Sequence, residues 1–258
     1  MNATIPIVKM NGTHNEFVLV DGRETRLDDP IAFAQRVCDR HAGIGADGLL
    51  LLLPSESADV RLRIINSDGS EAEMCGNGMR CVARYLDEHD GRSAALVETL
   101  AGPIATTVVA RDPDYLVSVE VNVPLVGQAH EVAGYTAIPV DVGNPHVVLF
   151  VDDLAAVDLG TIGPRIERDP RYPHGINVHF AQVTGPATLR ALHWERGAGA
   201  TQACGTGAVA VAAAAIVTRG LHEPLDIDVP GGRLRVNWAP GTRAVMTGNA
   251  VREFATTA

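Results

Sequence analysis

The feature that most constrains the fold of this chain is a short motif that occurs twice. Residues 74–78 read MCGNG and residues 203–207 read ACGTG, so both copies contain Cys-Gly-X-Gly. Each copy leads into a helical pattern that contains a Val-Ala pair. The two cysteines, Cys75 and Cys204, lie about half of the 258-residue chain apart. This repetition predicts two related halves, each of which places a cysteine at the N-terminus of a helix.

The rest of the chain predicts an α+β fold. Helical patterns cover residues 28–41, a segment that begins near 77, and a segment that begins near 206 and ends at Gly220. The last of these is almost entirely small and apolar, so it is expected to be buried on all sides. Alternating apolar runs, or one continuous run at 48–54, predict the strands. These strands cover residues 5–10, 16–21, 48–54, 59–65, 116–123, 146–151, 177–183 and 188–194.

Composition excludes several classes of function. The formal net charge of −10 repels phosphate backbones, so nucleic acid is not an expected partner. No apolar run approaches the ~20 residues that span a bilayer, and the N-terminal residues lack the pattern of a signal peptide. We therefore expect a soluble cytoplasmic protein with no membrane partner.

The four cysteines form neither a CxxC pair nor a zinc-binding pattern, so we expect free thiols and no metal site. Cys38 and Cys81 are expected to be core residues. His174 and His179 are expected to be ordinary surface or core residues, because no third ligand gives them metal spacing.

A cysteine at a helix N-terminus has a defined chemistry. The first N–H groups of a helix have no acceptor within it, and the helix dipole places partial positive charge there. Such a site binds a carboxylate, with glycine permitting close approach, and it stabilises a thiolate by lowering the pKa of the thiol. Two facing copies would hold one carboxylate with a sulfur atom on each side of its α-carbon.

That arrangement suits inversion of an amino-acid α-carbon. One thiolate removes the proton from one face, and the opposite thiol returns a proton to the other face. The helix dipoles on the carboxylate would stabilise the carbanion, so no cofactor is required and no pyridoxal-binding context is recognised.

Longer stretches around the two motifs resemble the diaminopimelate epimerase family. The two signatures are NSDGSEAEMCGNGMRC (66–81) and WERGAGATQACGTGA (194–208). Shorter matches follow the same order along nearly the whole chain: NEFVLVD (15–21), CDRHAGIGADG (38–48), GNPH (143–146) and GINV (175–178).

The resemblance implies a cofactor-independent isomerase that interconverts LL- and meso-2,6-diaminopimelate, on the route to lysine and peptidoglycan precursors. It implies two similar domains, each a curved, mostly antiparallel sheet around a central helix, with the active site in the cleft between them. We expect one half at residues 1–123 with a return strand at 250–258, and the other at 124–249. The only implied partner is the small-molecule substrate; many members of the family are dimers, which leaves a homodimer open.

The resemblance also implies roles for matching residues. Cys75 and Cys204 would be the acid/base pair, and His146 and Glu195 would orient or tune the catalytic centre. The reacting carboxylate would be held by backbone N–H groups of Gly76, Asn77, Gly205 and Thr206. Asn15 and Glu195 would lie near the reacting amine, whereas the distal head group would be held by Asn66, Asn144, Asn177 and Arg196.

Some of these residues have simpler interpretations. Asn66 and Asn144 are also typical of turns, and Glu195 with Arg196 could form a solvated pair at a strand end. The sequence also departs from the family pattern at Asn11, His14 and Glu16, and Gly48 stands where some members carry Gln. These departures put the contacts of the reacting amine in doubt.

Two other functions remain open from the sequence. A cofactor-independent racemase of another amino acid, such as proline, hydroxyproline or histidine, would use the same fold and the same two cysteines. A non-catalytic amino-acid-binding or thiol redox protein would instead exchange a disulfide with a reductant during function.

Overall fold

The computed structural model describes residues 4–258, so the first three residues of the predicted N-terminal half lie outside it. The fold is α+β, as the sequence predicted, with strands far outnumbering helices. The chain divides into two compact units. The first runs to Val119 and includes Gly248–Ala258, and the second is Glu120–Thr247.

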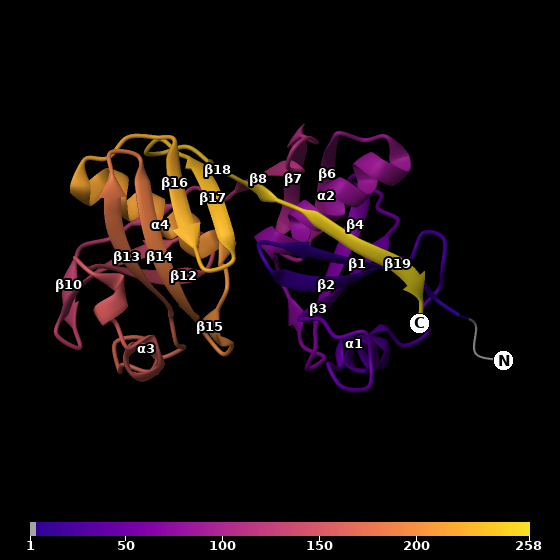
Figure 1. The fold of residues 1–258 in the computed structure, drawn as a ribbon, viewed down its shortest axis with the longest axis horizontal. Helices are drawn as coiled ribbons and strands as arrows, with labels where there is room; N and C mark the ends of the chain where they lie inside the picture. The colour runs from indigo at the N-terminus through magenta and orange to yellow at the C-terminus, as the bar shows by residue number, and fades with distance from the viewer. Residues whose placement is uncertain (1–3) are drawn as a thin grey trace. The chain divides into compact units, whose positions relative to one another are not determined.

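The first unit is a mostly antiparallel sheet with one helix against each side of its central strands. Starting from the C-terminal strand β19, neighbours pair in the order β19, β1, β2, β3, β4, β6, β7, β8, and only β2–β3 and β4–β6 are parallel. Figure 1 shows β19, in yellow, alongside β1. The strands are β1 (Pro6–Gly12), β2 (Asn15–Asp21), β3 (Gly48–Leu53), β4 (Val60–Asn66), β5 (Glu71–Ala72), β6 (Ala94–Thr99), β7 (Gly102–Ala110), β8 (Leu116–Val121) and β19 (Val251–Thr257).

The second unit repeats this topology. The strands β10 to β14 and β16 to β18 pair successively, and the parallel pairs β12–β13 and β14–β16 occupy the same places in the order. The shared order confirms the prediction of two similar halves. The strands are β9 (Leu125–Val126), β10 (His130–Val132), β11 (Tyr135–Asp141), β12 (Pro145–Phe150), β13 (Asn177–Gly185), β14 (Thr188–Glu195), β15 (Gly199–Thr201), β16 (Leu225–Val229), β17 (Gly232–Asn237) and β18 (Ala244–Asn249).

The parallel pairs require crossover connections, and the helices supply them. In the first unit, α1 (Pro30–Cys38) joins β2 to β3, and α2 (Gly76–Asp90) lies between β4 and β6. The corresponding helices of the second unit are α3 (Leu159–Glu167) and α4 (Gly205–Arg219). A short 3₁₀ turn at Leu154–Ala156 precedes α3.

Three helices match the sequence prediction and one was missed. The helix predicted at 28–41 is shorter, because Asp29 caps its start, Pro30 is its first residue and the backbone becomes extended at Asp39. The missed helix is α3, which contains two glycines and Pro164, all poor helix formers. Its stability comes from packing: an added Cβ at Gly163 would lie 2.6 Å from the Trp194 ring.

The helix α4 is buried on all sides from Gly207 through Ala215, as expected from its composition. It contacts strands of its own unit from β9 to β17, and Figure 1 shows it behind β13, β14 and β16. The expectation fails in the last turn, where Val217 is 51% exposed. That turn ends at Gly220, which adopts the left-handed conformation (φ 66°) and caps the helix.

Among residues 4–258, no helix is long and apolar enough to cross a membrane.

Candidate active site

Both motif cysteines occupy the N-cap position of a helix with nearly the same geometry. Cys75 precedes α2 (φ −141°, ψ 111°), and Cys204 precedes α4 (φ −120°, ψ 113°). Each Sγ accepts a hydrogen bond from the N–H three residues later, from Gly78 at 3.5 Å and from Gly207 at 3.3 Å. Cysteine here takes the place of the usual Ser, Thr, Asp or Asn cap.

The second glycine of each motif is required for packing. A Cβ at Gly207 would lie 2.5 Å from His179 Cε1, and a Cβ at Gly78 would lie 2.9 Å from Leu50 Cδ2. The motif glycines were expected to permit close approach of a ligand. At these two positions the contact between the helix and the side chains beneath it also requires glycine.

In the first unit, amide side chains link Cys75 to a group of charged residues. The Cys75 thiol lies 3.8 Å from Asn15 Oδ1, and the same oxygen accepts a hydrogen bond from Asn77 Nδ2 at 3.2 Å. At its other end, Asn15 Nδ2 donates to Asp47 Oδ2 at 2.6 Å. Arg40 also donates to that carboxylate. The structure therefore brings together three predicted site residues and fixes the orientation of their amides.

Arg80, a residue of α2, completes this network and was not anticipated from the sequence. Its side chain is fully buried, and it donates to Asn77 Oδ1 at 3.0 Å, to Asn249 O at 2.9 Å and to Thr13 Oγ1. Burial lowers the pKa of the guanidinium to about 10, whereas negative charge on Cys75 or Cys81 would raise it. A signal was present in the sequence: Arg80 lies three positions after Asn77, on the same helix face.

Asn66 lies apart from this network. It ends β4, and its side chain donates to Ser70 Oγ at 2.9 Å while its backbone N–H donates to Ser70 O. These contacts match the turn interpretation given above.

In the second unit, Cys204 is nearly buried, with 5% exposure, and lies 3.7 Å from Thr206 Oγ1. Burial, together with the negative charge of Glu195, raises the pKa of the Cys204 thiol well above its ordinary value. The expectation that the helix N-terminus lowers the thiol pKa is therefore wrong at this cysteine. Desolvation and a neighbouring carboxylate outweigh the helix dipole there.

Five further predicted residues lie at one end of the neighbouring strands β12, β13 and β14. Asn177 is 6% exposed, donates to Pro145 O at 2.9 Å, and accepts from the Arg196 backbone N–H at 3.0 Å. His146 is paired with Asn177 in the register of β12 and β13, and its Nε2 lies 2.7 Å from Asn144 Oδ1. Glu195 ends β14 and accepts from Thr201 Oγ1 at 2.6 Å.

His146 is the first of three buried histidines in a row. Its Nδ1 lies 2.8 Å from His179 Nε2, and His179 Nδ1 lies 2.8 Å from His193 Nδ1. Their exposures are 1%, 0% and 0%. His179 was expected to be an ordinary residue, and His193 was not considered. Because His179 and His193 are directly opposite in the β13–β14 register, only the strand pairing reveals them as neighbours.

Burial lowers the pKa of all three imidazoles. For His146 the pKa falls to about 3, with the positive charges of His193 and Arg196 adding to the effect of burial. For His193 burial alone lowers the pKa to about 4, and the pKa of His179 is also well below its ordinary value. The chain of histidines is therefore neutral at physiological pH.

The other two cysteines are core residues, as expected. Burial raises the pKa of Cys38 to about 11 and that of Cys81 to about 12, so both are unreactive thiols at neutral pH.

The positions that depart from the family pattern have local partners. Asn11 Nδ2 donates to Glu253 Oε1 at 2.8 Å and Asn11 Oδ1 accepts from the His14 N–H at 3.4 Å. Glu16 forms ion pairs with Lys9 at 3.2 Å and Arg40 at 2.6 Å. At Gly48, an added Cβ would lie 2.9 Å from Ile65 O, so this backbone leaves no room for a side chain there.

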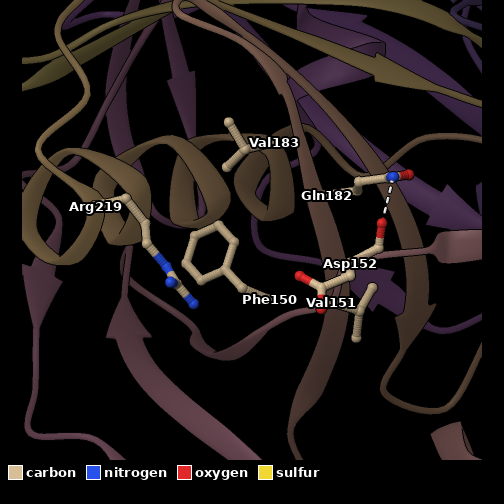
Figure 2. A pocket seen from close by; sticks show the side chains of 6 residues that line it. All are labelled: Phe150, Val151, Asp152, Gln182, Val183 and Arg219. Carbon is tan, nitrogen blue, oxygen red and sulfur yellow. Dashed lines mark hydrogen bonds between the residues drawn. The ribbon is translucent and has the colours of Figure 1, made fainter.

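Two other features have the form of a binding site: a group of possible metal ligands and a pocket. Asp21, Glu24 and His89 have ligand atoms within 4.8 Å of one another, but Arg23 already pairs with Asp21 at 2.5 Å. Figure 2 shows a pocket lined by Phe150, Val151, Asp152, Gln182, Val183 and Arg219. There the Arg219 guanidinium lies 4.8 Å from the centre of the Phe150 ring, at the opposite end of α4 from Cys204.

Comparison with known proteins places these features in a family. The family model described as diaminopimelate epimerase matches residues 7–124 and 138–253. A curated diaminopimelate epimerase of Carboxydothermus hydrogenoformans is 46% identical over 94% of this chain and 95% of the relative. The enzyme of that name from Desulfitobacterium hafniense is 41% identical over 96% of each chain.

Solved structures share the fold at lower identity. A phenazine biosynthesis protein of the PhzF family from Bacillus anthracis superposes with a TM-score of 0.75 over 99% of both chains, at 16% identity. A hydroxyproline epimerase from Agrobacterium vitis gives a TM-score of 0.67 over 99% of this chain and 91% of that one, also at 16% identity.

Proposed function

This chain belongs to the diaminopimelate epimerase family, and from that premise we propose that it interconverts LL- and meso-2,6-diaminopimelate by a two-base mechanism. The observation that carries the proposal is the pair of matching turns, in which Cys75 and Cys204 each cap a helix with the same backbone geometry. We propose that the functional halves are residues 1–123 with 250–258, and residues 124–249. The substrate would bind in the cleft between them.

In this mechanism the reacting carboxylate is held by N–H groups at the two helix N-termini, from Gly76, Asn77, Gly205 and Thr206. A thiolate at one cysteine removes the α-proton, and the C–H electron pair remains on the α-carbon as a carbanion stabilised by the helix dipoles. The thiol of the other cysteine then donates its proton to the opposite face. The enzyme ends with the two protonation states exchanged, ready for the reverse reaction.

The surroundings of Cys204 suit the acid role. Burial and Glu195 both disfavour its thiolate, so it would enter the cycle as a thiol. Cys75 would then be the resting base, close to the buried cation of Arg80. We further propose that Asn15 and Glu195 contact the reacting amine.

The distal head group of the substrate is a second amino acid, with one carboxylate and one ammonium group. We propose that Asn144, Asn177 and Arg196 bind it, since amides both donate and accept while guanidinium suits carboxylate. These three residues are already linked to one another or to β12 in the second unit. Asn66 is the fourth proposed contact, and it would have to exchange its bond with Ser70 for one with substrate.

The proposed setting is lysine biosynthesis in the cytoplasm, where thiols remain reduced and both cysteines stay active.

Proton NMR of LL-diaminopimelate with the protein in heavy water tests this function. We expect meso product and solvent deuterium at the α-carbon, and no exchange with L-histidine under the same conditions. Exchange of L-histidine without exchange of diaminopimelate would show a related racemase instead.

The two-base assignment is tested by single substitutions. Cys75→Ala and Cys204→Ala should each lower epimerisation by at least about 10³-fold, while diaminopimelate still binds. Cys81→Ala is the matched control, because Cys81 lies on the same helix as Cys75 but is buried in the core. Near-normal turnover by either Cys75→Ala or Cys204→Ala would exclude the mechanism.

A further inference from the structure

The three buried histidines of the second unit form a directed chain whose protons can be assigned. Asn144 Oδ1 can only accept, so His146 Nε2, 2.7 Å away, carries the hydrogen. A neutral imidazole has one N–H, so His146 Nδ1 must accept from His179 Nε2. By the same rule His179 Nδ1 accepts from His193 Nδ1. The hydrogens therefore all point from His193 towards Asn144.

The far end of the chain supports this direction. His193 Nε2 is the one buried side-chain nitrogen or oxygen in residues 4–258 that has no hydrogen-bond partner. In the assigned direction it is a lone pair. If the Asn144 amide were turned round, every proton would move to the other side of its ring, and His193 Nε2 would become a buried N–H without an acceptor. Buried orphan donors are rarer than under-satisfied acceptors, so the assigned direction is favoured.

The rings have little freedom to move. His179 fills the space next to the third residue of α4, where a Cβ at Gly207 would lie 2.5 Å from the ring. The centres of the His179 and His193 rings are 4.8 Å apart at an interplanar angle of 75°. The His179 ring therefore lies against the helix turn that carries Cys204, and it is also bonded to His146, the histidine that bonds Asn144.

We propose that His179 and His193 are positioning residues that act through His146 to hold the Asn144 amide with its nitrogen towards the substrate. Asn144 would then serve as a hydrogen-bond donor to the distal carboxylate, with its oxygen already occupied by His146. This inference rests on the proposed function, which assigns Asn144 to the distal head group.

The proton order is tested first, on the wild-type protein, by ¹⁵N–¹H NMR of the histidine side chains. We expect His146 and His179 to carry hydrogen on Nε2 and His193 to carry it on Nδ1. The reversed pattern would overturn the proposal. This readout needs no turnover, so it decides the proton order even if the protein does not epimerise diaminopimelate.

The consequence for binding is tested with two variants of His193. His193→Leu removes the donor to His179 Nδ1, so the His179 ring loses one of the two hydrogen bonds that fix it, and the Asn144 amide loses the fixed orientation that it receives through His146. We expect the KM for LL-diaminopimelate to rise about tenfold or more, with kcat changed by less than about threefold, because the lost contact binds substrate and transition state alike. In His193→Asn the amide nitrogen takes the place of Nδ1, so this variant should restore the wild-type KM.

Leu189→Ala is the control for lost stability, since Leu189 is a buried residue on the same face of β14 outside the chain. Its KM should remain that of the wild type. An unchanged KM in His193→Leu, or an equal rise in Leu189→Ala, would overturn the positioning role. If His193→Leu does not fold, the proton order together with the KM of His193→Asn still decides: a raised KM in a folded His193→Asn overturns the proposal.

Discussion

The two cysteine turns have almost the same backbone but are supported by opposite kinds of side chain. The Cys75 turn is bonded to a buried cation of its own helix, Arg80, which is tied through Asn77 and Asn15 to the carboxylate of Asp47. Beneath the Cys204 turn lies the uncharged ring of His179, within the histidine chain. A helix N-terminus is thus common to both turns, and the surrounding charges distinguish the two thiols.

Under the proposed two-base mechanism, this difference would let a symmetrical motif serve an asymmetrical task. A two-base inversion needs one thiolate and one thiol at the same time. A charged support favours ionisation of the nearby thiol, whereas burial beside Glu195 opposes it at Cys204. In the proposed mechanism, the repeated backbone would supply the two sulfurs and the unrepeated side chains would divide their roles.

The largest expected effect comes from removing the charged support. Arg80→Met leaves the acceptors of Asn77, Thr13 and Asn249 without their donor in a buried site. We expect the free energy of unfolding to fall by about 3–5 kcal/mol, measured by urea denaturation. The value of kcat/KM should also fall, because the Asn77 and Asn15 amides lose their fixed orientation.

Arg84→Met is the control on the same helix. Arg84 is partly exposed and bonds Glu88 and Ala250 O, so its loss should cost about 1 kcal/mol. Equal losses for the two arginines would mean that the buried charge does not support the first turn.

The buried, neutral histidines of the second unit should make the stability of the protein depend on pH. The folded protein keeps His146 and His193 unprotonated down to pH 3–4, whereas in the unfolded chain they take up protons below about pH 6.5. Stability from these groups is therefore complete above pH 6.5 and is lost as the pH falls towards 4. Between pH 7 and pH 5 we expect each histidine to contribute a loss of about 2 kcal/mol.

His193→Asn sharpens this test, because it keeps the hydrogen bond and removes one titrating group. Its free energy of unfolding should fall by about 2 kcal/mol less than that of the wild type between pH 7 and pH 5. Parallel curves for the two proteins would indicate that His193 is not held neutral by burial.

The sequence predicted the two cysteine turns, which repeat, better than the side chains that surround them, which differ between the units. The motif, the helices that follow it and the alternation of apolar residues depend on local chemistry, so the cysteine turns could be predicted. Eight of the nineteen strands in residues 4–258 were predicted from their apolar pattern, and β19 from the family resemblance. The others, such as β6, β7, β16 and β17, were missed. The side chains around the turns are held by contacts between distant segments. His179 lies opposite His193 because of the strand register, and Arg80 donates a hydrogen bond to Asn249, near the C-terminal end of the chain. The lowered thiol pKa predicted for the motif fails at Cys204 for the same reason, because Glu195 and the burial come from tertiary structure.

The second glycine of each motif should tolerate a methyl group differently in the two units. Gly207→Ala places its Cβ against the His179 ring, which neighbours hold in place, and we expect a loss of about 2 kcal/mol in the free energy of unfolding. Gly78→Ala meets the flexible end of Leu50, and the gain in helix propensity offsets part of the strain, so its loss should be under about 1 kcal/mol. Thermal unfolding of both variants measures the difference, and the reverse order would show that the histidine ring is free to move.

The smallest expected effect concerns the reactivity of the two thiols in the absence of substrate. Iodoacetamide reacts with thiolates, so alkylation followed by mass spectrometry compares Cys75 in the Cys204→Ala variant with Cys204 in the Cys75→Ala variant. We expect Cys75 to react about tenfold faster or more, since Cys204 is 5% exposed and burial beside Glu195 raises the pKa of its thiol. Adding Arg80→Met should slow Cys75, because the cation that favours its thiolate is lost. If Cys204 reacts first, the division of roles is the reverse of the proposed one, and the carboxylate of Glu195 does not keep the Cys204 thiol protonated.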